Sequence, residues 1–149
     1  MPDEGTRQPP RPARKRVVVL DDHAAMLEHA AVMLRKDFAV VALLTDMTSL
    51  LDGWAAAQPD VIVLDISLRR GSGFEACARL RAAGCAVPVV FLSVHQELDF
   101  VRAAFAAGGV GYVAKRDMAR YLVPAVRAAL RGCRYVSPAI RAVTESARR

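Results

Sequence analysis

The chain has 149 residues, of which 54% are hydrophobic and 24% are charged. This length suits one domain of about 100 to 200 residues with short tails and excludes a second full domain. The apolar content suffices for a buried core, which excludes global disorder. The longest apolar stretches, such as 38–44 and 86–92, span seven residues. They are far shorter than the roughly 20 residues that cross a bilayer, so we expect no membrane span.

The net charge of +6 is concentrated at the two ends of the chain. Residues 1–16 carry five basic and two acidic groups, and residues 127–149 carry six and one. The segment between them carries ten basic and twelve acidic groups. Basic ends suit nucleic acid or plain solvation, but few aromatic residues stand near them to stack on bases. We expect solvated tails.

The N-terminus and the cysteines indicate a cellular compartment. Acidic residues stand where a signal peptide carries positive charge, and no apolar stretch follows them, so export is not expected. The three cysteines, Cys77, Cys85 and Cys133, have neither CxxC spacing nor a clustered histidine partner. We interpret them as small buried side chains of a cytoplasmic protein.

Aliphatic runs alternate along the chain with stretches whose apolar residues recur at spacings of three and four. The runs lack polar alternation, which is typical of parallel strands buried on both faces. Strands are predicted at 16–20, 38–44, 61–64, 87–92 and 110–114. Helices are predicted at 23–36, 46–57, 74–83, 96–107 and 117–131. This repeat predicts an α/β fold, with a doubly wound five-stranded parallel sheet and five flanking helices.

The regular pattern defines the domain bounds. Residues 1–15 are rich in proline and arginine and predict a disordered leader. Residues 16–131 form the domain, and residues 132–149 form a linker or a short helix. In that helix Ser137 would be the N-cap and Pro138 would stand in the first turn.

Polar residues directly follow four of the predicted strands. They are Asp21 with Asp22, then Asp65, Ser93 and Lys115. Because ligands of such sheets bind beyond the carboxyl ends of the strands, we expect these side chains to converge. Three carboxylates brought together repel one another unless a cation is present, and a hard divalent ion takes oxygen ligands. The sequence therefore predicts a Mg²⁺ site.

One carboxylate beside such a metal can act as the nucleophile toward a phosphoryl group. Asp65 ends the central strand and is best placed for this role. The metal, the Lys115 ammonium and the Ser93 hydroxyl would each take a phosphoryl oxygen, which offsets the charge during in-line transfer.

Four sequence motifs resemble those of the receiver domains of two-component response regulators. They are VVVLDDH at 17–23, DVIVLD at 60–65, VVFLS at 89–93 and GYVAK at 111–115. The Asp-Asp-His start and the segment RGCRYVSP at 131–138 are similar to the NarL/FixJ subfamily. The resemblance implies a flavodoxin-like (CheY-like) sheet of order 2-1-3-4-5.

The resemblance also implies the roles of the acidic residues. Asp65 would be the phosphoacceptor. Asp22 would bind Mg²⁺ directly, Asp21 would do so through water, and the backbone carbonyl of Ser67 would supply a further ligand.

Further implied roles concern the switch and the partners. Ser93 and Lys115 would hold the phosphoryl group, and Tyr112 would be the switch aromatic that turns inward when Ser93 moves. A sensor histidine kinase or a phosphotransfer protein would donate the group to a signalling module that is not a turnover enzyme. A homodimer through the first and last helices is expected. Residues after 136 leave no room for a helix-turn-helix domain, so we expect no sequence-specific DNA binding by this chain. The chain would be either a stand-alone receiver or a regulator truncated after its receiver.

Departures from the family pattern keep two alternatives open. The loop at 68–73 reads LRRGSG, without the usual Met-Pro, and Val94 replaces a small residue and would narrow access to Asp65. These changes leave open a pseudo-receiver that acts as a scaffold without phosphorylation, although the intact acidic set and Lys115 argue against it. A Mg²⁺-dependent phosphohydrolase would need an acid two residues after its nucleophile, where Ser67 stands. His23 and His95 are interpreted as exposed residues.

Overall fold

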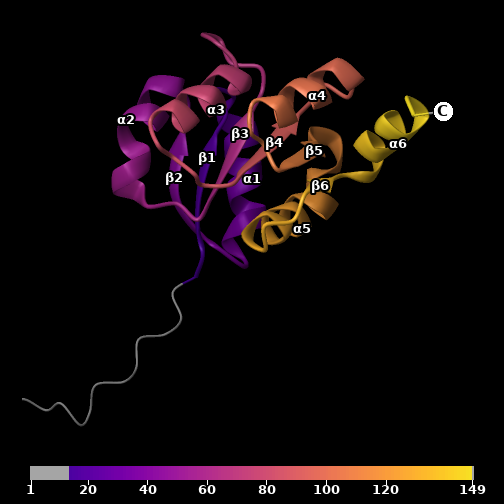
Figure 1. Cartoon of the computed structure of the whole chain (residues 1–149). Helices are drawn as coiled ribbons and strands as arrows, with labels where there is room; N and C mark the ends of the chain where they lie inside the picture. The colour runs from indigo at the N-terminus through magenta and orange to yellow at the C-terminus, as the bar shows by residue number, and fades with distance from the viewer. Residues whose placement is uncertain (1–13, 149) are drawn as a thin grey trace, which may run out of the picture.

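A six-stranded parallel sheet runs through the centre of the computed structural model, which describes residues 14–148 (Figure 1). The strand order is β2-β1-β3-β4-β5-β6. The strands are β1 (Arg16–Leu20), β2 (Ala39–Leu44), β3 (Val61–Asp65), β4 (Val89–Ser93), β5 (Gly111–Ala114) and β6 (Tyr135–Val136). The expected order of the first five strands is confirmed, and the α/β flavodoxin-like class with it. The prediction of five strands is wrong, because β6 has two residues and is too short to give a periodic signal.

Six α-helices flank this sheet. They are α1 (Ala24–Arg35), α2 (Met47–Ala57), α3 (Gly73–Ala82), α4 (Leu98–Ala106), α5 (Met118–Leu130) and α6 (Pro138–Ser146). The first five lie within two residues of their predicted bounds, and α2 begins after Asp46, whose carboxylate accepts a hydrogen bond from Ser49 N–H at 2.8 Å. The sixth lies in the segment 132–149, for which the sequence predicted a linker or a short helix. Most of the expected leader lies outside the described residues.

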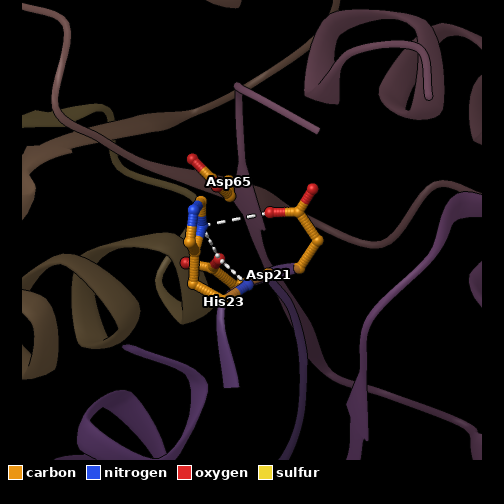
Figure 2. A group of neighbouring side chains, drawn as sticks. Asp21, His23 and Asp65 are labelled. Carbon is orange, nitrogen blue, oxygen red and sulfur yellow. Dashed lines mark hydrogen bonds and ion pairs between the residues drawn. The ribbon is translucent and has the colours of Figure 1, made fainter. Parts of the chain in front are cut away.

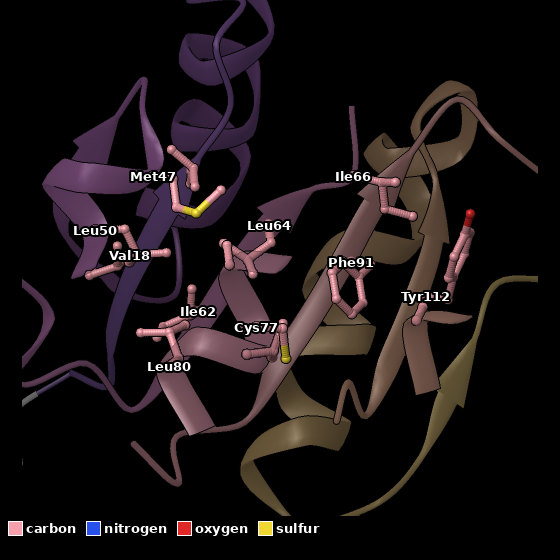
Figure 3. Close-up of a cluster of buried hydrophobic side chains, with 14 of the residues drawn as sticks. Val18, Met47, Leu50, Ile62, Leu64, Ile66, Cys77, Leu80, Phe91 and Tyr112 are labelled. Carbon is pink, nitrogen blue, oxygen red and sulfur yellow. The ribbon is translucent and has the colours of Figure 1, made fainter. Parts of the chain in front are cut away.

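The continuous apolar strands are explained by two hydrophobic clusters, one on each face of the sheet. Alternate side chains of β1 enter opposite clusters, Val18 and Leu20 on one face and Val17 and Val19 on the other. The first cluster, shown in Figure 3, joins β1 and β3–β5 to α2, α3, α4 and α6. The second joins the sheet to α1 and α5. Both faces of the central strands are therefore buried against helices, as the sequence pattern predicted.

Arg81 forms hydrogen bonds with the backbone of two loops at the amino edge of the sheet. Its Nη1 donates to the carbonyls of Cys85 at 2.9 Å and Val87 at 2.7 Å, and its Nη2 donates to the carbonyl of Gly108 at 3.0 Å. One half-buried guanidinium thus provides hydrogen bonds for three loop carbonyls, which would be costly to bury unpaired.

The three cysteines differ in burial. Cys77 and Cys85 are buried as expected, whereas Cys133 is exposed, because it follows the turn after α5 and does not enter the core. Among residues 14–148, no helix is long and apolar enough to cross a membrane.

Candidate functional site

The carboxyl ends of β1, β3 and β5 bring two aspartates and a lysine together. Lys115 opens a short 3-10 turn after β5, and its Nζ lies 2.8 Å from Asp21 Oδ2 and 3.2 Å from Asp65 Oδ2. The side chains of all three residues are at most 7% exposed. Low exposure strengthens these ion pairs, because little water screens the charges.

The loop between β3 and α3 wraps over this acidic edge. The N–H of Arg69 donates to Asp22 Oδ2 at 2.6 Å, and the N–H of Ser67 approaches Asp65 Oδ1 at 3.3 Å. Gly73 begins α3 directly against the carbonyl of Asp65, where any side chain would collide with the backbone. The loop therefore places its backbone within reach of the carboxylates while its arginine side chains remain exposed.

Three buried carboxylate oxygens at this edge have only ion-pair contacts, with Lys115 or with His23. They are Asp21 Oδ2, Asp22 Oδ1 and Asp65 Oδ2. Ligand atoms of these three residues and of His23 lie within 4.8 Å of one another. Three carboxylates against one ammonium leave the cluster with excess negative charge, and buried charges are normally paired or coordinate a metal. The carboxylate oxygens that carry this charge fit a hard divalent cation.

His23 belongs to this cluster, although the sequence predicted only an exposed residue. Its ring is 65% exposed, as expected, but Nδ1 lies 3.1 Å from Asp22 Oδ1 and 3.3 Å from Asp21 Oδ1 (Figure 2). The adjacency of His23 to two aspartates was visible in the sequence. The backbone turn that brings the ring back over them was not.

The electrostatics of Asp65 reflect its position. Burial raises the pKa of Asp65 above its ordinary value, the Lys115 ammonium lowers it in part, and the nearby Asp21 carboxylate raises it. Burial and neighbouring charges of this kind are the arrangement by which functional sites shift the pKa of a carboxylate.

Ser93 and Tyr112 are connected through the backbone of His95. Ser93 lies one position beyond the residue that pairs with Asp65, and its Oγ accepts the N–H of His95 at 3.0 Å. The Tyr112 hydroxyl donates to the carbonyl of His95 at 2.6 Å. Tyr112 is fully buried, and this burial raises its pKa to about 12.

The side chain of His95 is also ordered. Its Nε2 lies 2.9 Å from Ser67 Oγ, and its ring stacks on Phe100 with centroids 4.1 Å apart. His95 lies in a loop as expected, but its ring is half-buried, with 31% of it exposed. The stacking partner comes from the next helix, which local sequence reasoning did not consider. Val94, by contrast, is 64% exposed.

The doubly wound sheet makes this chain a flavodoxin-like α/β protein. Its buried acids and lysine form a polar site beyond the carboxyl ends of the strands. The sequence pattern of the response regulator receiver domain matches residues 17–127. The chain belongs to this family.

The solved structures to which the chain is similar include receivers of the LuxR and NarL groups. A two-component response regulator of the LuxR family from Aurantimonas is 30% identical with a TM-score of 0.84, covering 92% of this chain and 100% of that one. The NarL receiver of Mycobacterium tuberculosis is 29% identical with a TM-score of 0.76, covering 81% and 99%. The response regulator MtrA of Mycobacterium leprae is 32% identical over 79% of this chain and 52% of its own length. The chain thus spans about half the length of the curated relatives it matches.

Proposed function

We propose that this chain is a phosphorylation-dependent signalling switch whose phosphoacceptor is Asp65. The observation that carries the proposal is the cluster of three carboxylates with buried oxygens around Asp65, whose negative charge is offset by one buried ammonium, that of Lys115. Carboxylates in a purely structural role are normally paired with donors one for one. A site that receives a metal and a phosphoryl group keeps them available.

Mg²⁺ would be held by the carboxylates of Asp21, Asp22 and Asp65 and by the backbone carbonyl of Ser67. It would supply Lewis-acid neutralisation of the incoming phosphoryl charge. These residues fit the ion because their donors are oxygens and their three carboxylates carry more negative charge than the Lys115 ammonium offsets.

Transfer requires one new bond and one broken bond. A carboxylate oxygen of Asp65 attacks phosphorus, an O–P bond forms, and the P–N bond of a donor phosphohistidine breaks, so that the electron pair leaves with the imidazole. Lys115 Nζ lies 3.2 Å from Asp65 Oδ2, and its charge would offset that of a phosphoryl oxygen on this carboxylate. Ser93 would donate its O–H to another phosphoryl oxygen while its Oγ still accepts the N–H of His95.

The partners follow from this chemistry. A sensor histidine kinase or a phosphotransfer protein would supply the group in the cytoplasm, and a homodimer or a protein partner would read the altered surface. Turnover as a phosphohydrolase is less supported, because Ser67 stands where a leaving-group acid is needed and no carboxylic acid occupies that loop position.

The mass of the intact protein tests the proposal after incubation with Mg²⁺ and acetyl phosphate. We expect one added phosphoryl group on the wild type and none on Asp65→Asn or on a sample with chelator. Asp52→Asn, an exposed change on α2, serves as the matched control and should behave as wild type. A folded wild type that gains no mass from acetyl phosphate or from a phosphorylated histidine donor would favour the pseudo-receiver.

A further inference from the structure

The segment 134–146, here called the latch segment, extends the sheet and then packs on the α4 side of β5 (Figure 1). The N–H of Tyr135 donates to the carbonyl of Val110, and the N–H of Ser137 donates to the carbonyl of Tyr112, both at 3.0 Å. The Arg134 guanidinium lies 3.5 Å from the ring centroid of Phe105 on α4. These contacts attach the segment to β5, which carries Tyr112, and to α4, which packs beside β5.

Two fully buried residues anchor the latch segment. Ser137 stands at the N-cap position of α6 as predicted, but its side chain makes no cap hydrogen bond to that helix. Its Oγ instead accepts the N–H of Ala114 at 3.1 Å, one residue before Lys115. Ile140 is 0% exposed and belongs to the same buried cluster as Tyr112 and Phe91.

The far half of α6 is attached much less firmly. A shallow groove separates its last turns from α4, lined by Leu98, Ala142, Val143, Ser146 and Ala147. Its outward side chains are exposed. Few buried contacts of this kind mark a segment that can open locally while the rest of the domain stays folded.

A continuous set of contacts links this segment to the acidic site. Ser137 binds the backbone of Tyr112, the Tyr112 hydroxyl binds the carbonyl of His95, and the N–H of His95 binds Ser93. If α6 leaves, the Tyr112 ring loses part of its apolar cover and can leave the interior. The loop that carries Ser93 and His95 then loses the hydrogen bond from Tyr112.

We propose that the latch segment docks on β5 and α4 as an intramolecular switch element, and that its docking is coupled to phosphorylation of Asp65. This inference rests on the proposed function and extends it to regulation. The docked segment keeps Tyr112 inside and orders the loop that carries Ser93. Because Ser93 would bind a phosphoryl oxygen, the phosphorylated site favours the docked segment. By linkage, docking favours the phosphorylated site by the same factor. A partner that displaces α6 would therefore read the phosphorylation state.

Hydrogen exchange of the backbone amides at 135–146 tests the coupling, with beryllofluoride and Mg²⁺ as the phosphoryl mimic. In the wild type the mimic should slow exchange of these amides about threefold or more. Ile140→Ala should speed their exchange about tenfold or more, because burial of the side chain is lost. Ile140→Ala should also raise the dissociation constant of the mimic. The rise should not exceed the factor by which the mimic slows amide exchange at 135–146 in the wild type.

Two further variants keep the test decisive. Ser137→Ala removes only the acceptor for Ala114 N–H and should give the same changes at smaller size, even if Ile140→Ala destabilises the whole domain. Arg141→Ala, an exposed change on α6, should match the wild type. Exchange of β1 amides reports global unfolding.

The outcomes separate the two proposals. A wild type that binds the mimic with unchanged exchange at 135–146 would overturn the coupling alone. Variants with faster exchange at 135–146 that bind the mimic with wild-type affinity would also overturn the coupling alone. A wild type that neither binds the mimic nor gains a phosphoryl group would overturn the proposed function, and the coupling with it.

Discussion

The two edges of the sheet each use one basic residue, but they differ in how well their polar groups are paired. At the amino edge, Arg81 donates three hydrogen bonds to three loop carbonyls. At the carboxyl edge, the one ammonium of Lys115 faces a cluster of three carboxylates, so that negative charge is left uncompensated. The first arrangement stabilises the fold. The second holds unfavourable charge in place, as functional sites do.

The largest expected effect is at the amino edge. Arg81→Ala leaves three loop carbonyls without their donor, so we expect a loss of about 3 kcal/mol in the free energy of unfolding, at roughly 1 kcal/mol for each bond. Denaturant titration measures it. Arg79→Ala, on the same helix with a 60% exposed side chain and one 4.0 Å ion pair, should change stability by less than about 0.5 kcal/mol. Equal losses in both variants would remove the contrast between the two edges.

The next effect is stabilisation of the carboxyl edge by Mg²⁺. An ion that binds only the folded chain should add about 1.4 kcal/mol at a tenfold excess over its dissociation constant. Thermal unfolding with increasing Mg²⁺ measures this gain. Asp22→Asn should reduce it, and Asp52→Asn should leave it intact. An equal gain in all three proteins would indicate binding elsewhere.

The smallest effect is relief of buried charge at Asp65. Without divalent ions, Asp65→Asn should raise the free energy of unfolding at neutral pH by about 1 kcal/mol. Because folding raises the pKa of Asp65 above 3.8, the folded chain holds this proton to higher pH than the unfolded chain. Wild-type stability therefore falls as the pH rises from 3.8 through the raised pKa.

The stability difference between wild type and Asp65→Asn should accordingly be small below pH 3.8 and full at neutral pH. Urea titrations of both proteins across this range measure it. A less stable Asn variant at neutral pH would mean that the Lys115 ion pair outweighs the burial of charge.

Sequence reasoning predicted the sheet and the convergence at its carboxyl edge, because buried strands leave an apolar run and the next residue must emerge at the edge. It could not predict contacts that depend on how loops turn. The return of His23 over the aspartates and the stacking of His95 on Phe100 are of this kind. Ser137 is instructive, since its type and position suited a helix cap, while the neighbouring strand offered Ala114 N–H instead.

The roles assigned to the site residues remain predictions, and chemical trapping of the phosphorylated residue tests the central one most directly. Borohydride reduces an aspartyl phosphate to homoserine, so peptide mass mapping after phosphorylation and reduction identifies the acceptor. The account predicts homoserine at position 65 alone, and none when Mg²⁺ is chelated. Homoserine at position 21 or 22, or a phosphoryl group that borohydride does not remove, would contradict it.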